Sequence, residues 1–234
     1  MLTYSIELII DPQDLSAMQA AQQQIVLAKP VSDTYIPNVA WQSFDPLVDN
    51  VVTWSEEYGI YASNTNLVHG ARILKTSSMP YPAQPGAYYS FATDATFYGP
   101  IQESGAADTN EFGVSNDVPS ANHPALVFGL VQNAIINDTA FNFRPLNAQT
   151  VRANQRRTFT PLNTVYIWLQ SHLASGTVIT QLPRKVSIVT FGGVINAQTL
   201  KYDPASGMFV PYSPSKRSFL LNPPNVTLFD RVFI

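Results

Sequence analysis

The stretch Thr164–Gln170 reads TVYIWLQ, and its side chains alternate between two faces with the period of two that a β-strand requires. Val165, Ile167 and Leu169 fall on one face, whereas Trp168 falls on the other. Large apolar side chains on both faces need cover from a second sheet, another part of the chain or a ligand. The stretch therefore predicts a strand that is covered on both sides, inside an all-β fold.

Similar stretches recur along the chain and are often bounded by Pro or Asn, as is typical of strands in sandwiches and barrels. We expect further strands at Leu2–Ile10, Ile25–Ala28, Asn38–Gln42, Val51–Trp54, Tyr58–Ser63, Ala71–Thr76, Tyr88–Thr93, Leu126–Gln132, Thr158–Phe159, Thr177–Leu182, Lys185–Phe191, Leu200–Tyr202, Met208–Tyr212 and Thr227–Ile234.

One short helix is expected near the N-terminus. Asp11 is a candidate cap, Pro12 suits the first helical position, and Asp14 places an acid in the first turn. The helix is predicted to run from about Pro12 to Gln24.

The two parts of the chain share short motifs. The segment 44–47 reads FDPL and the segment 143–146 reads FRPL, while GARI at 70–73 aligns with GTVI at 176–179. An internal duplication would explain these matches, and two sandwich-like or jelly-roll-like halves would follow from it. The alternative is that unrelated β-sandwiches share turn spacing and apolar alternation.

Charge divides the chain in the same way. Residues 1–125 hold 13 Asp and Glu against 3 Lys and Arg, whereas residues 126–234 hold 3 against 10. We therefore predict an acidic β half at 1–98 with the N-terminal strand and helix, an acidic loop or linker at 99–124, and a basic β half at 125–234. Such opposite charges favour contact between the halves of one chain or between copies, and thus a homo-oligomer.

Several classes of protein are disfavoured by composition. The chain has no cysteine, which excludes disulfides, thiolate zinc sites and cysteine nucleophiles. No apolar run is long enough for a transmembrane helix, and a pI near 5.5 with no Lys/Arg run beyond two residues argues against nucleic-acid binding. The N-terminus lacks a basic segment and carries Glu7, so we expect no signal peptide in this chain, and a cytoplasmic location or release by a non-classical route.

Motifs for catalysis and metal binding are missing. His69, His123 and His172 have no other ligand type at metal-binding spacing, and neither a nucleophile elbow nor a phosphate loop occurs. A calcium loop starting at Asp108 would need an acid at its twelfth position, which is Pro119. We therefore expect no enzymatic activity, no cofactor and no metal.

The 27 aromatic residues provide the remaining functional signal. Tyr and Trp combine an apolar face with a polar edge, which suits sugar rings and protein interfaces. With few charges and many amides and hydroxyls, the sequence favours a non-enzymatic binding protein, lectin-like in the broad sense, for a glycan or small neutral polar ligand. Tyr61 and Trp168 are the predicted ligand-binding residues, although such aromatics often fill a sandwich core instead. The alternative function is a self-assembling structural protein, such as an inclusion, coat or filament subunit.

Overall fold

The computed structural model describes residues 2–31, 35–102 and 110–212. Strands account for 53% of the chain and helix for 4%, which confirms the predicted all-β class. The expected strand Thr227–Ile234 lies outside the described residues. Within the described part of the chain, no helix combines the length and apolar character needed to cross a membrane.

The largest sheet of the described residues has nine strands. Two of them, β11 (Thr139–Pro145) and β12 (Gln149–Arg152), pair with the 12-residue strand β10. β1 pairs with β16 in parallel and with β4 antiparallel. Across the sheet, the other strands follow the order β17 (Met208–Pro211), β16 (Ala197–Asp203), β1 (Thr3–Ile9), β4 (Asp49–Ser55), β10 (Ala125–Ile136), β5 (Gly59–Ser63) and β6 (Lys75–Ser78).

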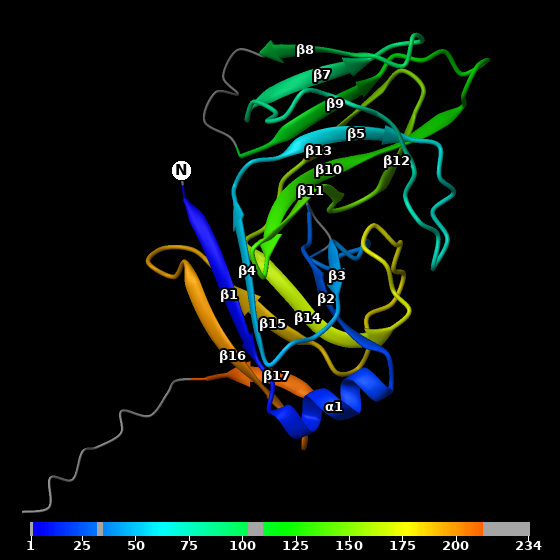
Figure 1. Ribbon diagram of the computed structural model, residues 1–234. Helices are drawn as coiled ribbons and strands as arrows, with labels where there is room; N and C mark the ends of the chain where they lie inside the picture. Colours follow the sequence, from blue (N-terminus) through cyan, green and yellow to red (C-terminus); the bar gives the residue numbers. More distant parts are fainter. Residues whose placement is uncertain (1, 32–34, 103–109, 213–234) are drawn as a thin grey trace, which may run out of the picture.

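Two four-stranded sheets lie toward opposite ends of the molecule (Figure 1). The first contains β13 (Gln155–Phe159), β9 (Phe112–Asn116), β7 (Ala87–Phe91) and β8 (Phe97–Gln102), in that order. The second contains β15 (Ser187–Thr190), β14 (Thr164–Ser171), β2 (Gln23–Ala28) and β3 (Gln42–Phe44), in that order.

One continuous apolar core joins the large sheet to both small ones. Toward the first small sheet, the ring of Phe128 on β10 packs 5.4 Å from that of Phe91 on β7, centroid to centroid. Toward the second, the ring of Trp54 on β4 lies 5.7 Å from that of Trp41, which precedes β3. The large sheet therefore forms a sandwich with a different small sheet at each end.

The N-terminal helix forms, but it is shorter than predicted. α1 spans Pro12–Ala20, and β2 begins at Gln23. Gln22 adopts a left-handed conformation with φ 53°, which ends the helix and turns the chain into the strand. Leu15 and Met18 pack against the core.

At residues 177–182 and 99–124 the structure differs from the sequence expectations. Residues 177–182 contain no regular strand, and Val178 makes only an isolated bridge to Val39. The predicted linker 99–124 contains β9, whose alternate residues Phe112 and Val114 are buried. The conformation of such short segments depends on contact with neighbouring strands, and the local pattern of side chains does not indicate that contact.

The two predicted halves share every sheet. β1 of the acidic half pairs with β16 of the basic half, β5 with β10, and β2 with β14. Tyr61 lies on β5 in the large sheet, whereas Trp168 lies on β14 in a small one. The structure does not confirm the duplication, and the division at 1–98, 99–124 and 125–234 stays a prediction from composition.

Candidate functional site

A surface hollow of about 440 Å³ lies where four segments of the chain meet. We call it the amide hollow, because neutral polar residues interrupt its apolar wall and none of the lining residues that the structure describes carries a formal charge. Its lining residues are Val31, Ile36, Pro37, Asn38, Leu67, Asn147, Gln149, Val178, Ile179 and Thr180.

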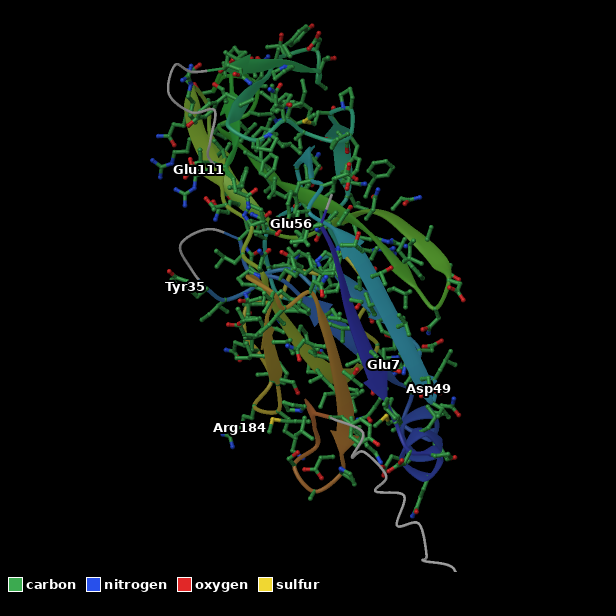
Figure 2. The ribbon with its side chains drawn as sticks, turned by 90° about the vertical axis from the view of Figure 1, so that its left-hand side faces the viewer. Glu7, Tyr35, Asp49, Glu56, Glu111 and Arg184 are labelled. Carbon is green, nitrogen blue, oxygen red and sulfur yellow. The ribbon has the colours of Figure 1, made fainter. Side chains whose placement is uncertain are left out.

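Backbone hydrogen bonds and one side chain hold the walls of the amide hollow together. The Ile179 N–H donates to the carbonyl of Asn38 over 2.9 Å. The Asn38 side chain donates from Nδ2 to the carbonyl of Ala148 over 2.6 Å and accepts from the Ala148 N–H at 3.2 Å. Asn38 therefore joins two segments: both ends of its side-chain amide bind the segment 147–149, and its backbone carbonyl binds the segment 178–180. Nearby, Tyr35 projects from the surface (Figure 2).

Asn147 is the buried polar residue of this wall. Its Oδ1 accepts a 2.8 Å hydrogen bond from the Leu130 N–H, and its backbone carbonyl accepts one of 2.7 Å from the Tyr61 hydroxyl. Its Nδ2 is buried and has no hydrogen-bond partner among the described residues. An unpaired buried amide costs about 1–3 kcal/mol, so Asn147 Nδ2 is a donor for which a bound acceptor would be favourable.

Gly129 allows Asn147 to approach β10 this closely. A Cβ on Gly129 would lie 2.0 Å from the Asn147 carbonyl oxygen and 2.8 Å from the Tyr61 ring. Only glycine leaves room for both at this point of the sheet.

The polar rim of the amide hollow is tied to residues around it. Thr180 Oγ1 lies 3.3 Å from His69 Nδ1, and Gln149 Oε1 accepts a 2.7 Å hydrogen bond from Arg157 Nε. The cationic Arg157 side chain is thus held by Gln149 and is not among the lining residues.

Tyr61 and Trp168, the predicted ligand-binding residues, are both buried. The Tyr61 hydroxyl bonds to Asn147, and Trp168 packs in one apolar cluster with Ile179, while Trp168 Nε1 donates to Gln170 Oε1 over 2.8 Å. Asn147 and Ile179 both line the amide hollow. The two predicted aromatics therefore lie behind this hollow and support its wall; direct ligand contact by them stays a prediction.

A second unusual site lies inside the core. Lys29 follows β2 and is 1% exposed, and its Nζ donates a 2.9 Å hydrogen bond to Gln132 Oε1. Three aromatic rings surround the amine, with Nζ 5.3 Å from the ring centroids of Trp41 and Trp54 and 5.7 Å from that of Tyr58. We call Lys29 with these three rings and Gln132 the lysine cage.

Burial controls the protonation of the lysine cage. Loss of hydration lowers the pKa of Lys29 to about 7, and the negative charge of Glu56 opposes that shift. Glu56 lies near the middle of the molecule's long axis (Figure 2) and accepts a 2.9 Å hydrogen bond from the Tyr4 hydroxyl. At neutral pH a large share of Lys29 is therefore the uncharged amine.

The histidines do not assemble into a metal site. His69 contacts Thr180 at the rim of the amide hollow, whereas His123 lines another hollow. His172 follows β14. Among the described residues, no group of three or more His, Asp or Glu side chains could hold a metal ion.

Sequence reasoning missed both Asn147 and Lys29. Lys29 had a local signal, since it follows the apolar run IVLA at 25–28 directly, where a charge is out of place. Asn147 had none, because its role depends on Leu130 and Tyr61, which are distant in the sequence.

Comparison of the chain with protein-family models, with curated proteins and with solved structures finds no match.

Proposed function

We propose that this protein is a non-enzymatic binding protein that takes a small neutral polar ligand, such as a sugar unit of a glycan, in the amide hollow. The observation that carries this proposal is the buried Asn147 Nδ2, which lacks a partner among the described residues in the wall of a hollow of about 440 Å³. Ligand pockets commonly range from about 300 to 1,000 Å³.

The chemistry of the lining argues for a neutral ligand. Val178 and Ile179 line the hollow with apolar side chains that suit the face of a ring, and Asn147, Gln149 and Thr180 are its polar lining residues. A charged ligand would find no countercharge among the described lining residues and would lose hydration on entry. A hydroxylated ring meets both requirements, because its faces are apolar and its edge donates and accepts.

Saturation-transfer NMR with methyl glycosides of glucose, galactose, mannose and N-acetylglucosamine tests this proposal. We expect transfer to at least one glycoside, and its loss in Leu67→Trp, which fills the hollow from its rim. Val68→Trp is the matched control, because Val68 is exposed on the same loop and is not among the lining residues. Absence of transfer to every glycoside, or equal transfer in the two variants, would contradict the proposal.

The second candidate function is self-assembly, and exposed apolar side chains favour it. Ile188 on the edge strand β15 is 57% exposed, Val194 in the following turn is 97% exposed, and Val210 on the edge strand β17 is also exposed. The two edges adjoin, since the Phe209 N–H donates to Ser187 Oγ over 2.9 Å. Exposed edge strands with apolar side chains are templates for pairing with another copy.

A further inference from the structure

A second hollow, of about 400 Å³, opens where two strands of the large sheet separate. β10 pairs with β5 over Val127–Val131 and with β4 at Ile135 and Ile136, whereas Gln132–Ala134 pair with neither. We call this opening the gap hollow. Its lining residues are Thr3, Thr53, Trp54, Ser55, Asn133, Ala134, Ile135, Ala140 and Asn142.

Two lining residues of the gap hollow, Trp54 and Ser55, contact the lysine cage. Trp54 is one of the lining residues of the hollow, and its ring, on the buried side of β4, lies 5.3 Å from Lys29 Nζ. Gln132 accepts a hydrogen bond from Lys29 Nζ and donates from Nε2 to the carbonyl of Ser55 over 2.6 Å. Ser55 also lines the hollow, so two hydrogen bonds separate the amine from it.

The setting of Lys29 suits a nucleophile. An uncharged amine carries a free electron pair, and desolvation among apolar side chains is a way in which proteins activate lysine. The same aromatic rings attract a cation through their faces, so they would also hold a positively charged product.

We propose that Lys29 is a carbonyl-reactive amine and that the gap hollow admits a small aldehyde to it. The Nζ electron pair attacks the carbonyl carbon and forms a carbinolamine. Loss of one water molecule, which takes the carbonyl oxygen and both amine protons, leaves a carbon–nitrogen double bond. Protonation gives an iminium ion among Trp41, Trp54 and Tyr58. Access requires the Gln132 side chain to release the carbonyl of Ser55.

Reductive methylation tests this proposal on the full chain. The intact protein is exposed briefly at pH 7 to ¹³C-formaldehyde and cyanoborohydride, and peptide mass spectrometry measures methylation at each lysine. Lys201 is the internal reference, because its side chain is 32% exposed and its ion pair with Asp11 raises its pKa. We expect Lys29 to be methylated at least about tenfold faster than Lys201, because a larger share of it is uncharged at pH 7. Slower methylation of Lys29 than of Lys201 would overturn the proposal.

Two variants test the route. Ala140→Trp fills the gap hollow from the exposed strand β11, and we expect it to slow methylation of Lys29 at least about tenfold while Lys201 is unchanged. Thr139→Trp is the matched control, since Thr139 is the exposed neighbour and is not among the lining residues. Equal rates at Lys29 in the two variants would overturn the gap hollow as the route. Neither result depends on glycoside binding at the amide hollow.

Discussion

The hydroxyl of Tyr61 donates a 2.7 Å hydrogen bond to the backbone carbonyl of Asn147, 86 residues further along the chain. This bond crosses from β5 to the segment between β11 and β12 and fixes the wall of the amide hollow. Both groups are buried, so neither can exchange the partner for water without cost.

Tyr61→Phe removes the hydroxyl and leaves the Asn147 carbonyl without that donor. We expect the free energy of unfolding to fall by about 1–3 kcal/mol, measured by urea denaturation. Tyr212→Phe, at a more exposed position after β17, should change it by less than about 0.5 kcal/mol. An equal effect of the two substitutions would argue against a structural role for the Tyr61 bond.

Gly129→Ala tests the close approach of Asn147 to β10. The new Cβ would meet the Asn147 backbone, which cannot swing aside, so we expect a loss of about 3 kcal/mol. In Gly113→Ala the new Cβ meets the half-buried Tyr88 side chain, which can rotate away, and the loss should be smaller. Thermal unfolding of both variants gives the comparison, and the reverse order would contradict this explanation.

Trp168→Ala distinguishes a packing role from a ligand contact. Trp168 is 2% exposed, so its removal should leave a cavity and lower the free energy of unfolding by about 3–5 kcal/mol. Chemical denaturation measures the loss. Unchanged stability together with lost glycoside binding would instead assign the ring to the ligand.

Lys29 should make stability depend on pH. Burial lowers its pKa to about 7, against about 10.5 in the unfolded chain, so the unfolded state binds more protons between these values. The stability of the wild-type protein should therefore rise with pH, by about 2 kcal/mol from pH 7 to pH 9 relative to Lys29→Met. Urea denaturation of both proteins across this range measures the difference, and parallel curves would contradict the low pKa.

Sedimentation at increasing salt concentration distinguishes self-association through apolar contacts from self-association through opposite charges. If β15 and β17 pair with another copy, sedimentation should show an oligomer that persists as salt rises, because apolar burial is not screened. Ile188→Lys should then give a monomer. Dissociation by salt would instead support attraction between the acidic and basic segments, for which the Lys201–Asp11 ion pair of 2.9 Å is an example within one chain. A monomer at every salt concentration would exclude both.

A strand with a continuous run of apolar and aromatic residues, such as β14, could be predicted from the sequence, and strands held by their neighbours could not. β14 was expected over Thr164–Gln170 and spans Thr164–Ser171. β11 and β12 were missed, because most of their side chains are exposed and their place depends on backbone pairing with β10. The predicted helix was too long, because the hydrophobic pattern of the sequence does not indicate the left-handed turn at Gln22.

The site that we propose agrees with the composition but does not coincide with the predicted residues, and ligand binding stays a prediction. Low charge and abundant amides indicated a neutral polar ligand, and the amide hollow has that lining. The predicted aromatic residues Tyr61 and Trp168 are buried, because their rings pack in the apolar core behind the hollow. Asn147 could not be found from its neighbours in sequence, since its significance comes from the hydrogen bond that its Nδ2 lacks.

The side-chain amide signal of Asn147 in a ¹⁵N–¹H spectrum gives the most direct test of ligand binding in the amide hollow. Titration of the wild-type protein with the methyl glycosides should shift this signal in a saturable way for at least one of them. The shift should persist in Val68→Trp and vanish in Leu67→Trp. An Asn147 signal that stays in place with every glycoside would contradict ligand binding at this site.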